Sequence, residues 1–270
     1  MSYISYNNIL AYVSNGDEQS LSVASYNRLY ASNVAVNNSA NIQRIKRIDG
    51  EEDYYNQTGP KSATVSTVII PVTGTGLNQI TDLLVLTGDF FSGSYFQVPN
   101  YRFEKCYLKS FSVNFEPWRV SQASLQFDCY GLATGNGVSL QTPSESSQSL
   151  VSPLRGTSIN VSNFGYFSGL INEYESINFE VSVDRAANYE IGSEYPKKVS
   201  VAKISKTLQI NGISNLEWVA DYDPKQSMNF ELTMADANVI SVSGIVVNQS
   251  FSVDANGVAK TNLTIIEEVV

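Results

Sequence analysis

Apolar and polar residues alternate along most of this chain, and the alternation is clearest between Phe179 and Asn211. Val181 and Val183 are each flanked by polar residues, and the same pattern returns in a second run formed by Val199, Val201, Ile204, Leu208 and Ile210. A period of two is typical of strands with one buried face. The pattern predicts two strands in this stretch.

The segment between these two strands, Asp184 to Pro196, breaks the alternation and is interpreted as a structured loop. Gly192 permits a positive φ that other residues resist, and Pro196 can begin the next strand because no ladder donor is needed there. Strand, tight loop, strand is therefore the expected arrangement.

Similar patterns occur twice along the chain and in the same order. Residues 41–70 align with residues 176–210, which places Asp49 on Asp184 and Tyr54 on Tyr189. Residues 76–84 resemble residues 212–219, and both have the apolar spacing of a short helix. The clearest match is a repeated tetrapeptide, Ser-Phe-Ser-Val, at Ser110, Phe111, Ser112, Val113 and again at Ser250, Phe251, Ser252, Val253.

Each tetrapeptide is followed by a turn and a terminal strand, residues 123–130 in the first copy and 259–266 in the second. Asn256-Gly257 is a strong hairpin signal, and Glu116 to Arg119 occupies the same place in the first copy. We therefore predict two tandem domains, residues 1–140 with an N-terminal arm and residues 154–270, joined by a Gly- and Ser-rich linker at 141–153. A single large β-sandwich with similar strands is the alternative.

Composition agrees with a β-rich protein and argues against a DNA-gripping surface. The 270 residues are 43% apolar and only 16% charged, with a net charge of −9 and no histidine. Affinity for phosphate backbones depends on clustered Lys and Arg. An acidic surface suits a conduit to which nucleic acid does not adhere, although a generic acidic protein explains the charge equally well.

No apolar run reaches the length of a membrane span, and the first residues lack the basic start and apolar core of a secretory signal. Folding in a cytoplasm is expected. Cys106 and Cys129 are predicted to lie on facing strands of one hairpin, where a bridge is geometrically conceivable. The reducing compartment favours buried free thiols.

The sequence offers little to catalysis. Absence of histidine removes Ser-His-Asp triads, Cys-His pairs and most zinc sites, and no phosphate-binding glycine loop is present. Three carboxylate clusters are interpreted as solvated loop faces: Glu51, Glu52 and Asp53; Glu173 and Glu175; Glu190 and Glu194. Asp221 and Asp223 lack the rest of a calcium loop. We expect no catalytic, cofactor-binding or metal-binding residue.

Aromatic residues cluster between Asp89 and Gln97, as Phe90, Phe91, Tyr95 and Phe96. Such a run could form a carbohydrate- or receptor-binding platform. A core strand or a contact between subunits would use it as readily, because aromatic residues are enriched at interfaces.

The loop of the second copy resembles a segment of bacteriophage tail tube proteins, which reads strand, Asp-Arg, Tyr, Leu/Ile-Gly-Ser, Pro, strand. The matching residues are Asp184, Arg185, Tyr189, Ile191, Gly192, Ser193 and Pro196. The first copy has Gly59-Pro60 near this position but lacks the element in register. The resemblance implies a mainly β fold, with two tandem antiparallel β-sandwich or β-barrel domains, each with a short helix.

In this family, subunits form six-fold rings whose inner sheets join into a continuous barrel, and the rings stack into a tube. Two such units in one chain imply homotrimeric, pseudo-hexameric rings. The resemblance further implies a virion protein of the tail, assembled in the cytoplasm of a host bacterium, with no membrane insertion. Its partners would be copies of itself, the tape measure, baseplate and terminator proteins, a sheath if the tail contracts, and DNA in transient, non-specific passage.

The sequence is therefore expected to encode a major tail tube subunit. Its architectural residues would be those of the second-copy loop and the two repeat strands that hold the sheets: Asp184, Arg185, Tyr189, Gly192 and Pro196; Ser110, Phe111 and Val113; Ser250, Phe251 and Val253. The alternatives are a tube-like ring at the end of the tail (baseplate, hub or terminator) and a receptor- or carbohydrate-binding β-protein of the virion. A hydrolase ranks last.

Overall fold

The fold is mainly β, and no helix occurs in the part of the chain that the structure describes. The structure is a computed structural model. It describes residues 10–14, 26–39, 42–46, 53–57, 62–70, 72–73, 94–98, 101–116, 119, 121–131, 133–135, 149–150, 158–164, 167–171, 173–214, 227–233, 239–253 and 255–269.

Most strands belong to one antiparallel sheet of 14 strands, and two short antiparallel pairs, β3–β4 and β6–β11, stand apart from it. The strands up to residue 135 are β1 (Leu10–Ser14), β2 (Tyr26–Ser39), β3 (Ile42–Lys46), β4 (Asp53–Gln57), β5 (Ser62–Ile69), β6 (Val72–Thr73), β7 (Ser94–Val98), β8 (Tyr101–Phe115), β9 (Gln122–Cys129) and β10 (Ala133–Gly135). The later strands are β11 (Ser149–Leu150), β12 (Ser158–Phe164), β13 (Phe167–Ile171), β14 (Ser176–Tyr189), β15 (Pro196–Ile213), β16 (Met228–Thr233), β17 (Val239–Val253) and β18 (Ala259–Val269).

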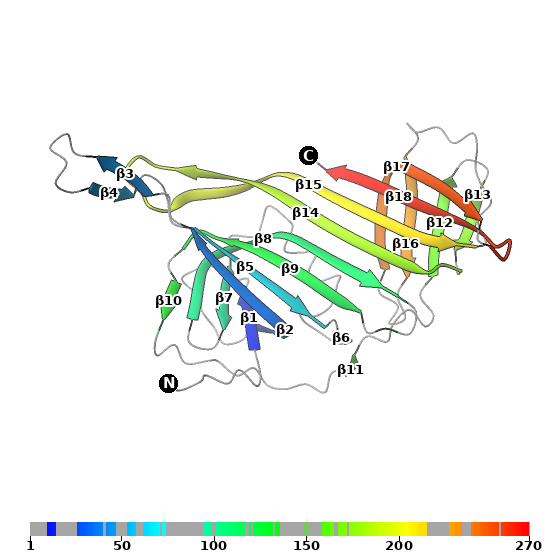
Figure 1. The fold of residues 1–270 in the computed structure, drawn as a ribbon, viewed down its shortest axis with the longest axis horizontal. Helices are drawn as coiled ribbons and strands as arrows, with labels where there is room; N and C mark the ends of the chain where they lie inside the picture. The colour runs from blue at the N-terminus through cyan, green and yellow to red at the C-terminus, as the bar shows by residue number, and fades with distance from the viewer. Residues whose placement is uncertain are drawn as a thin grey trace.

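A row of eight neighbouring strands crosses the molecule, in the order β2-β5-β9-β8-β14-β15-β18-β17 (Figure 1). The first four strands come from the first half of the chain and the last four from the second half. The two halves meet where β8 pairs with β14. This junction is made by ordinary antiparallel ladder bonds, so the two halves share one sheet.

The two halves follow the same order of strand neighbours. In the first half the order is β2-β5-β9-β8-β7-β1, and β1 then pairs with the beginning of β2. In the second half it is β14-β15-β18-β17-β16-β12, and β12 then pairs with β13, the strand just before β14. Each of the six strands named for the first half thus has a counterpart among the six named for the second half. The sheet as a whole is not closed, because β13 has β12 as its single neighbour among the described strands.

The core lies on one face of this row. Buried and exposed positions alternate in β5, β9 and the first part of β14, as a half-buried strand requires. Aromatic pairs link neighbouring strands: the ring centroids of Phe96 and Phe127 are 5.5 Å apart, and those of Phe111 and Phe179 are 5.8 Å apart. Full burial of one such side chain contributes roughly 1.5–3 kcal/mol, so these residues dominate the stability of the sheet.

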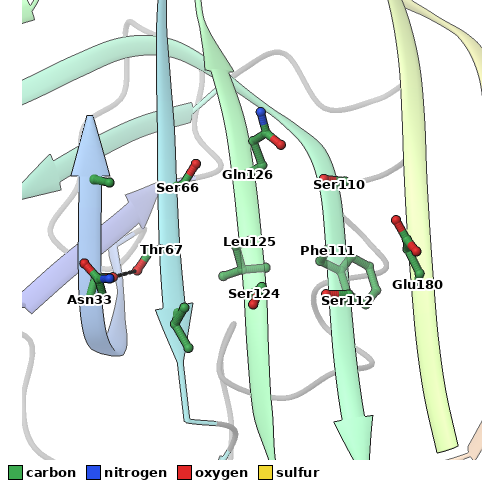
Figure 2. A pocket seen from close by; sticks show the side chains of 12 residues that line it. Asn33, Ser66, Thr67, Ser110, Phe111, Ser112, Ser124, Leu125, Gln126 and Glu180 are labelled. Atoms are coloured by element: carbon green, nitrogen blue, oxygen red, sulfur yellow. Dashed lines mark hydrogen bonds between the residues drawn. The ribbon is translucent and has the colours of Figure 1, made fainter. Parts of the chain in front are cut away.

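The opposite face of the row carries hydroxyl and amide side chains. Figure 2 shows them on β2, β5, β9 and β8, with the carboxylate of Glu180 on β14 beside them. A shallow depression of about 260 Å³ runs over this face, and its polar lining includes Ser66, Ser110, Ser112, Ser124 and Gln126. Thr67 points to the other side, where its hydroxyl donates to the backbone oxygen of Asn33 at 2.8 Å.

The hairpin predicted around Gly192 is confirmed, but its loop is shorter than expected. β14 continues to Tyr189 and β15 begins at Pro196, so only residues 190–195 form the turn. The ladder shifts register between Asp184 and Arg185 and again between Asn188 and Tyr189. These bulges break the alternation of side chains, which is why the sequence pattern suggested an earlier end. Gly192 has the expected positive φ of 85°.

Two expectations for other elements need correction. Residues 26–39, expected to belong to an N-terminal arm with a short strand or two, form the long strand β2, because Val34 and Val36 alternate with polar residues even in an Asn-rich context. The second helix was expected to begin at Gly212, but Gly212 and Ile213 are the last residues of β15. The remainder of that segment, and residues 76–84, lie outside the described residues.

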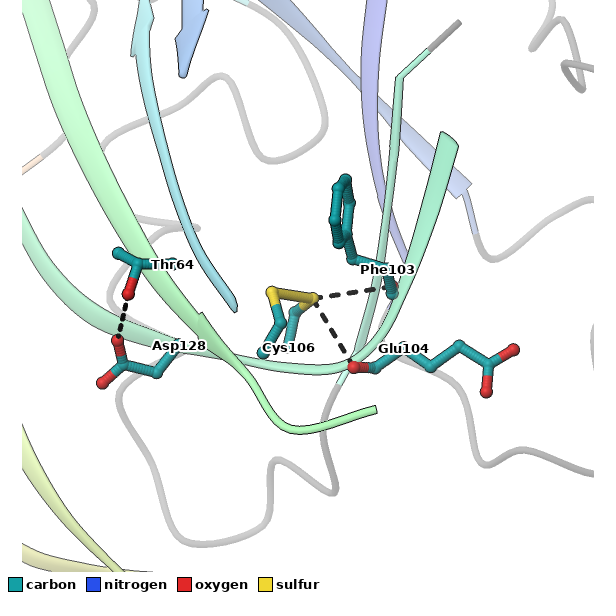
Figure 3. The surroundings of a disulfide bond; sticks show 6 residues. Thr64, Phe103, Glu104, Cys106 and Asp128 are labelled. Atoms are coloured by element: carbon teal, nitrogen blue, oxygen red, sulfur yellow. Dashed lines mark hydrogen bonds between the residues drawn. A yellow bond between two sulfur atoms is a disulfide. The ribbon is translucent and has the colours of Figure 1, made fainter. Parts of the chain in front are cut away.

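Cys106 and Cys129 form a disulfide, so the expectation of free thiols is wrong. The two residues are direct partners in the β8–β9 ladder, with Cα atoms 4.0 Å apart. Figure 3 shows the bond beside the hydrogen bond from the Thr64 hydroxyl to Asp128. The prediction that the two cysteines lie on facing strands of one hairpin is confirmed. Their direct pairing in the ladder brings the two sulfur atoms within bonding distance.

Among the described residues there is no helix long and apolar enough to cross a membrane.

Candidate assembly interface

The two halves of the chain are joined by one strand pairing, between β8 and β14. Residues 110–115 of β8 pair with residues 177–182 of β14, in antiparallel register from Ser110–Ser182 to Phe115–Ile177. Phe111 and Val113 of the first repeated tetrapeptide are buried, and Phe111 meets Phe179 edge to face. The junction therefore combines ladder hydrogen bonds with a continuous apolar core.

The second copy of the same tetrapeptide lies at the end of the row in a different environment. β17 pairs with β16 only through Val239–Gly244, and beyond that point its one neighbour among the described strands is β18. Phe251 is 48% exposed and Val253 is 56% exposed. Identical residues are thus covered by β14 in the first half and remain half exposed in the second.

The face of β17 that would be covered is set by a bulge. The β17–β18 register shifts between Val246 and Asn248, so Gln249, Phe251 and Val253 follow Val246 onto the core face. Gln249 has both side-chain amide atoms buried and without a hydrogen-bond partner among the described residues. A buried amide without a partner costs about 1–3 kcal/mol, so a further hydrogen-bonding group at this place would stabilise the stretch.

The other end of the row is β2. Its residues 31–39 pair with β5, whereas β1 covers only residues 26–30 on the other side. Residues 34–39 therefore have one strand neighbour among the described strands. Val36 lies on this stretch and is 40% exposed. Exposed strand edges invite pairing with another strand.

The hairpin β14–β15 is fixed against the first half near its far end. Arg185 donates from Nε to the backbone oxygen of Leu108 at 3.3 Å, and its guanidinium carbon lies 5.4 Å from the Tyr107 ring centroid. Tyr107 in turn contacts Tyr130, with centroids 6.0 Å apart. Burial, followed by the charge of Asp128, raises the pKa of Tyr130. These contacts hold the hairpin at a set angle to β8.

The turn at the tip of this hairpin is built from local hydrogen bonds. Ser193 donates from its backbone nitrogen to the oxygen of Glu190 at 3.0 Å, and its hydroxyl donates to the oxygen of Tyr195 at 2.7 Å. Ile191 is fully exposed at the apex. Pro196 is buried at the start of β15, and Tyr189 is 41% exposed.

The predicted site residues thus fall into two groups. Asp184, Arg185, Tyr189, Gly192 and Pro196 lie together along one hairpin, whereas the two tetrapeptides lie in different parts of the row, one at its middle and one at its end. Sequence reasoning missed Val36 and Gln249. The alternation of apolar and polar residues around Val36 could have predicted its strand. The burial of the Gln249 amide depends on the bulge in β17, which no local sequence pattern predicts.

Three of the carboxylates considered for catalysis have ordinary partners. Glu173 accepts a hydrogen bond from the Ser214 hydroxyl at 2.6 Å, Glu175 pairs with Lys260, and Glu190 pairs with Lys197. Within the described ranges, no group of His, Cys, Asp or Glu could hold a metal ion. Glu51, Glu52, Asp221 and Asp223, and the aromatic residues Phe90 and Phe91, lie outside the described residues.

Comparison with known proteins adds no family to this picture. Neither the protein-family models nor the curated proteins include a match to the chain.

Proposed function

We propose that this protein is a structural subunit of a bacteriophage tail tube, assembling into stacked rings around a channel for the genome. One observation carries the proposal: both halves follow the same strand order, and the row they share ends in two incomplete edges. A chain with one completed junction and two open ends is suited to repeated addition of further copies. The resemblance of the hairpin around Gly192 to tail tube proteins points the same way.

In this proposal each half is one tube-like domain, so three chains would make a pseudo-six-fold ring. The core occupies one face of the row, which leaves the hydroxyl and amide face as the one that can line a channel. Lys109, Lys203 and Lys260 each form an ion pair with a carboxylate, and the net charge of the chain is −9. DNA passing such a surface finds little to bind, because retention on phosphates needs clustered positive charge. The protein would thus belong to the virion tail, alongside other tail proteins.

The test is negative-stain electron microscopy of the purified protein combined with its native mass from light scattering. Hollow tubes with a regular axial repeat, or rings of three chains, are the expected result. Rings of six chains would retain the tube and contradict the pseudo-six-fold arrangement. Single rings that never stack would favour a component at the end of the tail. A monomer at every concentration tested, even with a tail-tip complex present, would contradict the proposal.

A further inference from the structure

We propose that the end of β17 in one copy pairs with the end of β2 in the next copy, reproducing between chains the β8–β14 junction found within the chain. This inference rests on the assembly proposed above and names its joint. The pairing is antiparallel. It places Val253 opposite Val34, Phe251 opposite Val36 and Gln249 opposite Asn38.

The equivalence of β17 with β8 follows from matching irregularities in their ladders. The β8–β9 register shifts between Leu108 and Ser110, and the β17–β18 register shifts between Val246 and Asn248. Superposing the two shifts places residues 248–253 on residues 110–115. Residues 110–115 are the segment that β14 covers.

The equivalence of β2 with β14 follows from the ladders that connect them to β8 and β17. Phe127 pairs with both Leu108 and Val65, and Ile265 pairs with both Val246 and Leu208, so Val65 falls on Leu208 and Ser62 falls on Ser205. Ser39 pairs with Ser62 in the β2–β5 ladder, and Ser182 pairs with Ser205 in the β14–β15 ladder. Aligning these two pairs places residues 34–39 on residues 177–182, which are the residues that contact β8. The two open edges of the chain are therefore the counterparts of the two edges already joined in its middle.

The chemistry of the two edges agrees with this register. On the core face, the exposed Val253 and Val36 would each gain an apolar neighbour from the other chain. Gln249 would face Asn38, whose amide can both donate to and accept from the Gln249 amide. A buried amide that lacks a partner among the described residues of one chain would thus find one in the next.

The two edges cannot pair within one chain. They belong to the first and last strands of the eight-strand row, which Figure 1 shows at different ends of it, and no ladder joins β2 to β17 among the described strands. A contact between two different patches of the same molecule is head-to-tail, and it generates a ring when the rotation closes. The occupant of each edge is therefore a second copy of this chain.

Cysteine cross-linking tests the register. On the hydroxyl face, Asn37 is expected opposite Ser250, so the double variant Asn37→Cys with Ser250→Cys should form disulfides between chains. The native Cys106–Cys129 bond, also between direct cross-strand partners, shows that such a bridge fits this sheet, and its burial keeps it out of the exchange. The matched control is Asn37→Cys with Ser252→Cys, which is two residues out of register. Non-reducing gels should show multiples of the chain mass in the first variant and at least a tenfold weaker ladder in the control.

The outcomes separate this joint from the proposed function. A ladder in the first variant together with tubes or rings supports both. A ladder without tubes or rings supports the joint and contradicts the tube. Tubes or rings in which neither variant cross-links, or both do equally, overturn the joint and leave the tube standing. A chain that neither assembles nor cross-links overturns both.

Discussion

At the scale of single residues, Gly212 combines a left-handed backbone with crowded surroundings. Its φ is +69°, and a Cβ there would lie 2.4 Å from the Cγ of Glu175. Its nitrogen also donates to the Asn262 side chain at 2.8 Å, which fixes its place. Gly192 has a φ of +85° but no atom within 4 Å of its would-be Cβ.

We therefore expect Gly212→Ala to lower the free energy of unfolding by more than the left-handed backbone cost of roughly 1 kcal/mol, because the Glu175 side chain, which pairs with Lys260, has to move as well. Gly192→Ala should lower it by only that backbone cost. Urea denaturation of the two variants measures the difference, and equal losses would contradict the assignment.

The partly buried phenol of Tyr174 makes the free energy of unfolding depend on pH in the alkaline range. Burial raises the pKa of its phenol from the ordinary value of 10.0 to about 12. Between these values the native state binds more protons than the unfolded state, so the stability that the neutral phenol contributes is complete below pH 10 and is lost as the pH rises towards 12. Tyr174→Phe removes this group.

The expected result for Tyr174→Phe is a shallower fall of the free energy of unfolding from pH 10 to pH 12 than in the wild type. Tyr189→Phe is the control, because Tyr189 is 41% exposed and its loss should change the slope less. Denaturant titrations at several alkaline pH values give the slopes. An unchanged slope in Tyr174→Phe would rule out a role for this phenol.

At the scale of elements, the edge of β2 offers a direct test of assembly. Val36→Lys places a charge on the core face of this edge, where a neighbouring strand would have to bury it. Val239→Lys is a matched control, because Val239 is a similarly exposed strand valine (46% against 40%) in the part of β17 that β16 already covers.

For Val36→Lys we expect the association constant of each joint to fall at least tenfold, which corresponds to about 1.4 kcal/mol, with little change for Val239→Lys. Sedimentation velocity at matched concentrations reports the assembled fraction, from which the constant follows. If both variants assemble like the wild type, the β2 edge is not a joint.

The elements also show what local patterns reveal. The β14–β15 hairpin was predictable because Gly192 and Pro196 act through backbone geometry alone, and the strands after each tetrapeptide were predictable from alternation and turn residues. The extent of β14 was not, because two bulges reverse the facing of its side chains. β2 was missed because its polar face is rich in Asn, which is uncommon in strands.

At the scale of the whole molecule, matching segments suggested a repeat, but their registers were wrong. The tetrapeptides align Phe251 with Phe111, whereas the shifts in the two ladders align Phe251 with Val113. No local pattern indicates that β8 of the first half pairs with β14 of the second, since this depends on residues about seventy positions apart meeting in register. The candidate interface follows from that pairing. Its open ends become visible only when the completed junction can be compared with them.

The covalent connection between the two halves also affects the rate at which several chains would assemble into a ring. The β8–β14 contact forms within one polypeptide, so its completion does not depend on protein concentration, and the linking chain keeps the two partners at a high effective concentration. Closing a circle of six similar units would then require three bodies to meet instead of six. Dilution should therefore slow growth much less steeply than it would for separate halves, and half-finished arcs should be shorter-lived.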